Sequence, residues 1–129
     1  MKRNVIHSDH APQAIGPYSQ AIAAEGRFVF VAGQIGLDPA IGKLVEGGIE
    51  AQARQVLENL KAILEAAGTD LKHVVKTSVL LHKIADFPAI NAIYGTYFTE
   101  NPPARATFGG LELPLGALVE IECVALIPN

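Results

Sequence analysis

The sequence has little cysteine and little positive charge, and each shortage argues against a class of protein. Its one cysteine, Cys123, cannot form a disulfide within the chain. Such usage is typical of a reducing cytoplasm, where we expect this protein to act. Ten lysines and arginines stand against 13 aspartates and glutamates, which gives a formal net charge of −3. Because no basic block or basic helical face occurs, the sequence argues against a dedicated nucleic-acid-binding protein.

Long apolar runs and the common cofactor motifs are also missing. No run approaches the roughly 18 apolar residues that a membrane helix needs. The first stretch, MKRNVIHSDHAP, has no apolar core after its two basic residues, so we do not expect it to be a signal peptide. No G-x-G-x-x-G motif, P-loop or nucleophile elbow occurs. The four histidines lack the spacing of a metal-ligand set, so we expect no metal site.

Apolar residues are what the chain has in abundance. Half of its 129 residues are hydrophobic, and the mean hydropathy is +0.28. This length is that of one ordinary domain, so we assign residues 1–129 to a single domain with one core. A domain of this size cannot bury so much apolar surface by itself. We therefore expect part of that surface to lie in an interface between subunits.

Hydrophobic periodicity predicts two helices and six strands. Apolar residues spaced three and four apart predict a helix over residues 49–67, and Gly68 is well placed to end it. A second helix is predicted to begin at Asp86, with Pro88 in its first turn, and to run to about Phe98. Period-two patterns and turn residues predict strands over residues 5–6, 18–23, 28–32, 74–81, 104–111 and 118–126.

Turn residues also predict how the strands pair. Glu25 and Gly26 form a tight turn that would make a hairpin of the second and third strands. The stretch 114–116 (Pro-Leu-Gly) would join the last two strands side by side. The order β-β-β-α-β-α-β-β predicts an α+β sandwich, in which two helices cover one face of a mostly antiparallel six-stranded sheet. No helix remains for the other face, so we expect a symmetric oligomer to cover it.

The last predicted strand carries two carboxylates on one face. In VEIECVALI, Glu120 and Glu122 alternate with Ile121 and Cys123, which places the carboxylates about 6–7 Å apart and opposite the apolar side chains. Cys123 is therefore expected in the core. A solvated edge of the sheet explains the two glutamates. A site in which a cation relieves their repulsion explains them as well.

Arg105 follows two prolines in the stretch ENPPARATFGG and opens a predicted strand. A buried arginine needs an anionic partner, and the sequence offers two. One is a structural ion pair with Glu120 or Glu122, on what is predicted to be the neighbouring strand. The other is a carboxylate ligand, which the planar guanidinium binds through two parallel hydrogen bonds, as lysine cannot.

Two other polar residues have ordinary interpretations on the sequence alone. Asn91 falls about 80° from the centre of the apolar stripe of the second helix, and asparagines at such a border are usually half-exposed surface. Tyr18 follows Gly16 and Pro17, which direct its backbone tightly. A tyrosine at the start of a strand is nevertheless most often part of the core.

Taken in order, seven segments of the chain resemble the Rid/YjgF family. These proteins are the reactive intermediate deaminases, also called 2-iminobutanoate/2-iminopropanoate deaminases. The resemblance covers nearly the whole chain, and the motifs IGPYSQA and PAR are specific to the family in combination. The resembling segments are AIGPYSQA (14–21), VFVAGQIG (29–36), EAQARQVLENLKAILEAAG (50–68), VVKTSVLL (74–81), INAIYGTYF (90–98), NPPARA (101–106) and VEIECVALI (119–127).

The resemblance implies a homotrimer with a chorismate-mutase-like fold and active sites between subunits. It implies hydrolysis of the enamine and imine acids that pyridoxal-phosphate enzymes release, such as 2-aminoacrylate and 2-iminobutanoate, which protects those enzymes. Neither a cofactor nor a metal is implied, and neither a nucleic acid nor a membrane is a partner. A trimeric metabolite-binding module without turnover is an alternative. A third is the ribonuclease or translation-inhibitor role of some relatives, which the lack of clustered lysines and arginines disfavours.

The same resemblance implies roles for individual residues. Arg105 corresponds to the arginine that binds the substrate carboxylate, and Glu120 corresponds to the acidic residue that holds the attacking water. Thr107 stands where relatives often have cysteine, at a position that acts mainly through its backbone. The stretch FGGLELPLG differs from the sequence that is commoner at this place in the family. The residues implied to line the substrate pocket, besides Arg105, are Tyr18, Gly33, Asn91 and Thr107.

Overall fold

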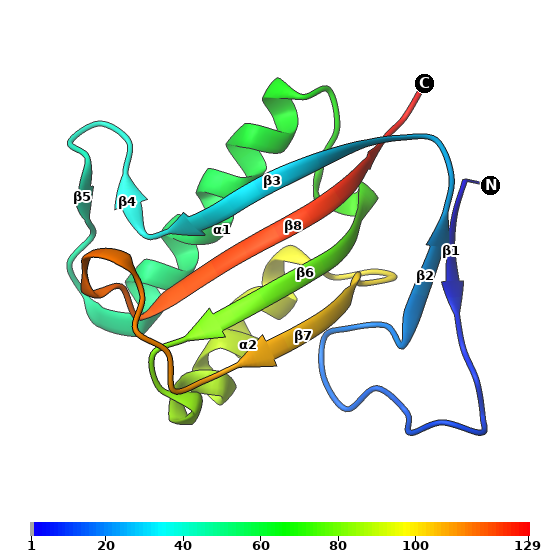
Figure 1. Cartoon of the computed structure of the whole chain (residues 1–129), viewed down its shortest axis with the longest axis horizontal. Coiled ribbons are helices and arrows are strands. Elements are labelled where there is room, and N and C mark those ends of the chain that lie inside the picture. Colours follow the sequence, from blue (N-terminus) through cyan, green and yellow to red (C-terminus); the bar gives the residue numbers. More distant parts are fainter. Residues whose placement is uncertain (1) are drawn as a thin grey trace.

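A computed structural model describes residues 2–129 of the chain. The strands are β1 (Arg3–Ile6), β2 (Ala21–Ala24), β3 (Arg27–Ile35), β4 (Leu37–Asp38), β5 (Lys43–Leu44), β6 (Val74–Leu81), β7 (Ala104–Phe108) and β8 (Val119–Ile127). The helices are α1 (Gly48–Ala66), α2 (Phe87–Tyr97) and three short 3-10 helices, η1 (Leu71–His73), η2 (Ile84–Asp86) and η3 (Pro114–Gly116). The main sheet has four strands in the order β3-β8-β6-β7, and α1 and α2 cover one of its faces (Figure 1).

The helix α1 packs across β3 and β8, as its sequence pattern predicts. Its apolar residues, spaced three and four apart, bury one continuous stripe against the sheet, and the predicted helix over 49–67 is confirmed to within one residue at each end. Gly68 follows the helix with φ of +83°, a conformation in which a side chain would be strained. The buried residues of α1 are Gln52, Ala53, Val56, Leu57, Leu60 and Leu64.

The second predicted helix is confirmed as α2, but its N-terminus lacks the side-chain cap expected from Asp86. Asp86 occupies the N-cap position, but its side chain makes no capping hydrogen bond, because the single turn η2 leads directly into the helix. Pro88 lies in the first turn, where the missing amide costs nothing. Since α2 connects β6 to β7, it forms a crossover that makes these two strands parallel neighbours.

The predicted pairing of the last two strands is wrong. β7 pairs with β6, and β8 lies on the far side of β6, between β6 and β3. Gly109 and Gly110 end β7 at Phe108, before the predicted end at 111, and the chain then crosses the end of β6. Along that crossing Leu111 donates its amide hydrogen to the carbonyl of Leu81. β8 buries more apolar residues than any other strand of this sheet, so it takes one of the two central positions, where the helices cover it.

The predicted hairpin of the second and third strands is also wrong. The turn at Gly26 exists, but β2 pairs with β1 in antiparallel register, whereas β3 pairs with β8. The β1–β2 pair is joined to the main sheet by two hydrogen bonds from the Arg3 guanidinium to the carbonyl of Val74, and an isolated bridge joins Ser19, just before β2, to Ala104. The sheet is therefore one of four strands with two separate pairs, and the predicted continuous six-stranded sheet is not found. β4 and β5 form a small pair in a stretch for which no strand is predicted.

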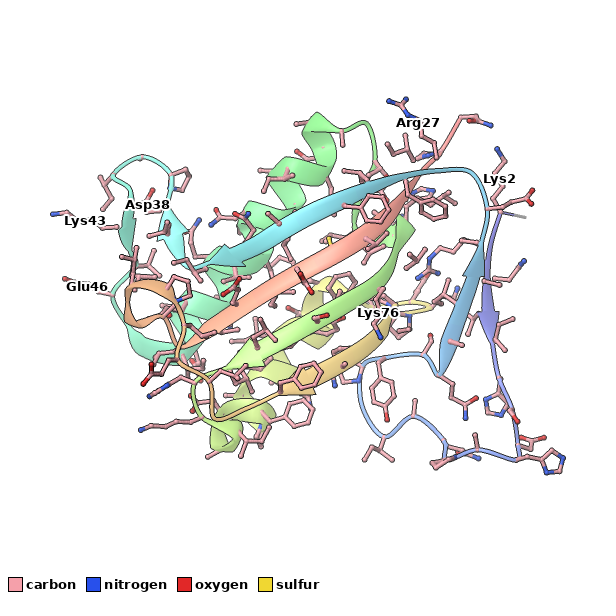
Figure 2. The ribbon with its side chains drawn as sticks, in the orientation of Figure 1. Lys2, Arg27, Asp38, Lys43, Glu46 and Lys76 are labelled. Atoms are coloured by element: carbon pink, nitrogen blue, oxygen red, sulfur yellow. The ribbon has the colours of Figure 1, made fainter. Side chains whose placement is uncertain are left out.

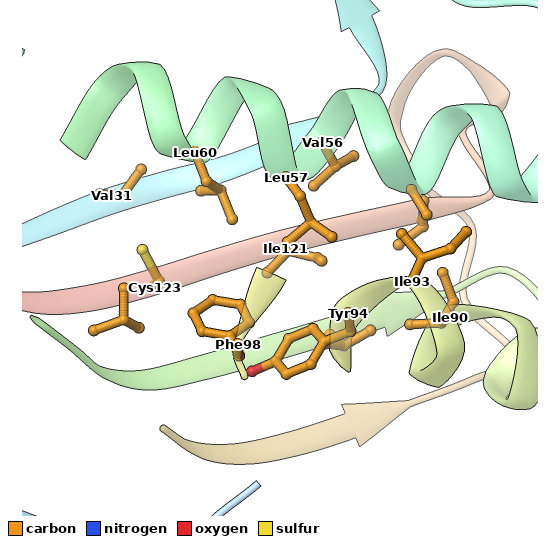
Figure 3. Packing of buried hydrophobic residues seen from close by; sticks show 14 of the residues in the cluster. Val31, Val56, Leu57, Leu60, Ile90, Ile93, Tyr94, Phe98, Ile121 and Cys123 are labelled. Atoms are coloured by element: carbon orange, nitrogen blue, oxygen red, sulfur yellow. The ribbon is translucent and has the colours of Figure 1, made fainter. Parts of the chain in front are cut away.

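The core lies between the helices and the sheet (Figure 3). Cys123 is buried there, as predicted, and burial raises the pKa of its thiol to about 12. Tyr94 and Phe98 lie side by side, with ring centroids 4.5 Å apart. The other large residues of the cluster that Figure 3 labels are Val31, Val56, Leu57, Leu60, Ile90, Ile93 and Ile121.

The opposite face of the sheet has no helix over it (Figures 1 and 2). Phe30 is 77% exposed on this face, and a shallow hollow of about 150 Å³ lies beside it, lined also by Lys76, Glu122 and Val124. The uncovered face predicted from counting elements is thus confirmed, whereas the subunit expected to cover it stays a prediction. Among residues 2–129, no helix is both long enough and apolar enough to cross a membrane.

Candidate active site

The N-terminal loop is fastened to the segment that carries Arg105. The amide of Ser19 donates a hydrogen bond of 3.1 Å to the carbonyl of Pro103, and the Ser19 hydroxyl donates one to the carbonyl of Pro102. The two prolines lie just before β7, and their carbonyls hold the loop. As a result the side chain of Tyr18 lies beside Arg105, although the two residues are far apart in the sequence.

Three aromatic rings and one amide surround the guanidinium of Arg105. Its central carbon lies 5.3 Å from the ring centroid of Tyr18, 5.2 Å from that of Phe87 and 4.9 Å from that of Tyr94. All three distances fall within the range of cation–π attraction. The Nη1 group donates a hydrogen bond of 2.8 Å to Oδ1 of Asn91. The side chain is thus oriented from several directions at once.

Three of these neighbours come from one face of α2. Phe87, Asn91 and Tyr94 are spaced four and three residues apart, so they form a row along the helix that faces β7. The hydroxyls of Tyr94 and Thr77 lie 2.7 Å apart in a hydrogen bond, and both residues are fully buried. Thr77 is the register partner of Arg105 on the adjacent strand, so this bond ties the helix to the sheet beside the guanidinium.

No carboxylate of residues 2–129 pairs with Arg105. The structural ion pair with Glu120 or Glu122, one of the two alternatives left by the sequence, is therefore not formed within the chain. Burial lowers the pKa of Arg105, and the nearby Tyr94 and Tyr18 act in the opposite direction. An arginine stays protonated under these conditions, so the site holds a cation without a counter-charge.

Glu120 and Gly33 form a second, separate contact. A β-bulge at Ala32 and Gly33, opposite Glu122, brings the backbone of Gly33 under the Glu120 side chain. A Cβ atom at position 33 would overlap Oε2 of Glu120. Glycine is therefore required for the carboxylate to occupy this position.

The two contacts lie on opposite faces of the sheet. Arg105 and its parallel partner Thr77 point to the same face, which is the helical one because Thr77 is fully buried under α2. Glu120 alternates with Val119 and Ile121, both fully buried toward the helices, so its side chain points to the uncovered face. The structure thus joins Tyr18, Asn91 and Arg105 in one cluster and Gly33 with Glu120 in another.

The larger cavities of the chain lie elsewhere. One of about 410 Å³ and one of about 530 Å³ lie near the end of α1 and the two termini, and none of the residues that contact Arg105 lines them. No group of three histidine, cysteine, aspartate or glutamate side chains in the described part of the chain is arranged to hold a metal ion. The Arg105 cluster therefore lies outside both of these cavities.

The sequence matches a known protein family over most of its length. Residues 8–127 match the family described as endoribonuclease L-PSP, which is also called the Rid or YjgF family. The chain belongs to the Rid/YjgF family. This confirms the family that the motifs around Tyr18, Arg105 and Glu120 resemble.

Relatives of this Rid-family chain include proteins named as deaminases. The human 2-iminobutanoate/2-iminopropanoate deaminase is 51% identical over 124 residues, covering 96% of this chain and 90% of the human protein. Protein DfrA of Myxococcus xanthus is 51% identical over 127 residues, covering 98% and 97% of the two chains. The crystal structure of RidA from the Antarctic bacterium Psychrobacter sp. is similar with a TM-score of 0.76 at 45% identity, covering 96% of this chain and 99% of that one. The mixed α+β fold with two helices is thus that of the family.

Thr107 lies on β7 two residues after Arg105, and its side chain points to the same face of the sheet. Its hydroxyl is buried and has no hydrogen-bond partner among the described residues. A buried hydroxyl without a partner costs about 1–3 kcal/mol. The resemblance implies that Thr107 lines the pocket through its backbone, and the structure indicates that its side-chain hydroxyl destabilises the fold.

The substitution Thr107→Val is expected to raise the free energy of unfolding by about 1 kcal/mol, because it replaces the unpaired hydroxyl by a methyl group of the same shape. Urea unfolding at a fixed chain concentration measures the change. Thr77→Val is the matched control and should lower the free energy by about 1–3 kcal/mol, since it leaves the buried Tyr94 hydroxyl without a partner. A Thr107→Val chain less stable than the wild type would contradict this account.

The family resemblance implied pocket roles for Tyr18, Asn91 and Arg105, which the structure brings into one cluster, but it did not include Phe87 or Tyr94. The signal that could have found both is the spacing of Phe87 and Tyr94 around Asn91, which places all three on one face of the helix.

Proposed function

We propose that this chain hydrolyses 2-imino acids, such as 2-iminobutanoate and 2-iminopropanoate, to 2-keto acids and ammonia. The observation that carries the proposal is the guanidinium of Arg105, a cation enclosed by rings and left without a counter-charge. Such a group suits the carboxylate that every 2-imino acid carries beside its C=N carbon. The names of the human, mouse and rat relatives, at 51–52% identity, support the same reaction.

Arg105 would bind the substrate carboxylate with the N–H groups that Asn91 leaves free. Neutralising that carboxylate makes the adjacent carbon, C2, more electrophilic. Glu120 would hold a water molecule and take its proton as the oxygen attacks C2. That proton then passes to nitrogen to give the carbinolamine. Its hydroxyl proton is transferred to nitrogen as the C–N bond breaks and the C=O bond forms, which releases ammonia and leaves the 2-keto acid. A positioned base of this kind supplies about 10²–10⁴-fold.

The proposed reaction requires two copies of the chain. Arg105 and Glu120 lie on opposite faces of one sheet, so they meet only if Glu120 is supplied by another subunit. The uncovered face, with Phe30 and the glutamates, offers the surface for such contact. We propose a homotrimer of the chorismate-mutase-like type, in which sheets pack together and each site combines Arg105, Tyr18 and Asn91 of one subunit with partners from the next.

The remaining pocket residues have supporting roles in this proposal. Gly33 keeps the Glu120 carboxylate in place by lacking a side chain, and Thr107 contributes its backbone to the wall beside Arg105. No cofactor or metal takes part in the proposed steps. In a cytoplasmic setting the reaction would remove 2-aminoacrylate and related intermediates before they damage pyridoxal-phosphate enzymes.

A ribonuclease is the second activity that the family description suggests. Contacts to several phosphates need clustered lysines and arginines. The net charge of this chain is −3, and the neighbours of Arg105 are rings and an amide. We therefore favour the imino acid over RNA as the substrate.

The proposal is tested by generating 2-iminobutanoate from threonine with a dehydratase and following the loss of the imine. The wild-type chain should accelerate the loss and release ammonia and 2-oxobutanoate in equal amounts. A parallel incubation with single-stranded RNA should leave the RNA intact. If the imine decays at the uncatalysed rate, the chain is not a deaminase, and cleaved RNA would point to the second activity.

A further inference from the structure

The guanidinium of Arg105 is held on the helical side by Phe87 and Tyr94, neither of which the proposed reaction uses. The Phe87 and Tyr94 centroids lie 5.2 Å and 4.9 Å from the guanidinium carbon. Asn91, between them on the same face of α2, fixes one nitrogen through its hydrogen bond. The three residues together restrict both the position and the tilt of the guanidinium plane.

This arrangement differs from that of an ion-paired arginine. A carboxylate partner orients a guanidinium but also cancels its charge. Rings attract the cation through their π faces and leave the charge intact. Within residues 2–129 Arg105 has ring and amide contacts and no acidic partner, so its orientation is fixed while its attraction for an incoming anion is kept.

Tyr94 is itself held in place by Thr77. The two hydroxyls lie 2.7 Å apart, both residues are fully buried, and the Phe98 ring packs against Tyr94 with centroids 4.5 Å apart. Thr77 is also the neighbour of Arg105 across the parallel strands. Any shift of Tyr94 away from the guanidinium would therefore break a buried hydrogen bond.

We infer that Phe87 and Tyr94, with Thr77 tethering Tyr94, are positioning residues that aim the Arg105 guanidinium at the substrate carboxylate. This inference rests on the proposed function, since it takes Arg105 as the group that binds the carboxylate. We call Phe87, Tyr94 and Thr77 the frame of Arg105. Phe87 and Tyr94 contact the guanidinium and Thr77 contacts Tyr94, so none of the three needs to contact the substrate.

The test is an NMR titration with 2-oxobutanoate, the 2-keto acid that the proposed reaction releases, which gives a Kd for the folded chain without turnover. Phe87→Leu keeps an apolar side chain but removes the ring, and we expect it to raise the Kd about three- to tenfold. Phe87→Tyr should restore most of the lost affinity. The matched control is Tyr97→Leu, which removes a ring of the same helix that bonds to Glu58 instead and should leave the Kd unchanged.

The tether is tested by the double variant Thr77→Val/Tyr94→Phe. It removes both hydroxyls together, so no unpaired polar group remains and the chain should stay close to wild-type stability. We expect its Kd for 2-oxobutanoate to rise about two- to threefold because the ring is no longer fixed. A purely structural role would change the folded fraction and leave the Kd of the folded chain unaltered. If Phe87→Leu does not fold, this double variant still tests whether the frame positions the guanidinium.

The positioning role of the frame is contradicted if Phe87→Leu has the wild-type Kd for 2-oxobutanoate, or if Tyr97→Leu raises the Kd as much as Phe87→Leu does. A wild-type Kd in the double variant would remove Thr77 and Tyr94 from the frame. If the wild type binds 2-oxobutanoate but does not accelerate imine loss, the proposed function fails and the frame stands. If the wild type does not bind 2-oxobutanoate, the carboxylate role of Arg105 fails and the frame fails with it.

Discussion

Replacing Arg105 by lysine is expected to lower kcat/KM for 2-iminobutanoate by about 100-fold, which corresponds to about 2.7 kcal/mol. Lysine keeps the charge but loses the planar fork that binds a carboxylate through two hydrogen bonds. Each charge-assisted bond is worth about 1.5–3 kcal/mol, so the loss of one well-directed bond accounts for the effect. The rings of Phe87 and Tyr94 cannot orient an ammonium group as they do a flat guanidinium. Steady-state rates of imine loss give the ratio.

Arg27→Lys is the matched control for this change. Arg27 is exposed at the start of β3, so Arg27→Lys makes the same substitution away from the Arg105 cluster. The kcat/KM of this variant should equal that of the wild type. The role assigned to Arg105 is contradicted if Arg105→Lys retains more than about half of the wild-type kcat/KM.

Gly33→Ala is expected to lower kcat by about 100-fold, as would removal of the Glu120 base itself. The added Cβ would occupy the position of Oε2 of Glu120, so the carboxylate must move away from the place where it would hold water. The KM should change little because the substrate carboxylate would be bound by Arg105, which in the proposed site comes from a different subunit than Gly33 and Glu120. The same imine assay, run over a range of substrate concentrations, separates kcat from KM.

The matched control is Gly95→Ala. A Cβ at position 95 would lie 3.8 Å from Cβ of Pro17, which is an ordinary contact. Alanine also favours the helix by about 1 kcal/mol over glycine, so this variant should be active and slightly more stable. A Gly33→Ala chain with wild-type kcat would show that the position of the Glu120 carboxylate does not matter to the reaction.

The helices and most strands could be predicted because their signals are local. The spacing of apolar residues in 49–67 and the alternation in the last strand both report a single buried face, and the structure has both. Strand pairing could not be predicted in the same way. The turns at Gly26 and before Val119 are present, yet neither joins two paired strands, because β8 finds longer apolar partners in β3 and β6. Pairing is decided by packing across the whole sheet, which short turn motifs do not encode.

The residues of the Arg105 cluster were implied by the family resemblance, whereas patterns within the sequence left Tyr18 and Asn91 with ordinary roles and did not give the geometry. Arg105, Asn91 and Tyr18 do come together, through contacts that connect the N-terminal loop, α2 and β7. The sequence suggested that Glu120 lies beside Arg105 on a neighbouring strand, whereas β6 separates the two strands. The mistake follows directly from the wrong pairing, since strand order decides both the neighbours of a side chain and the face on which it lies.

The central claim is that Arg105 of one subunit and Glu120 of another act on the same imino acid, and mixing two inactive variants tests it most directly. Arg105→Ala and Glu120→Gln chains would be denatured together in equal amounts, refolded, and assayed for loss of 2-iminobutanoate. If each site combines two subunits, about a quarter of the sites regain both residues, so about a quarter of the wild-type activity should return. Each variant refolded alone should stay inactive. A mixture that is as inactive as its two components would contradict a site built between subunits.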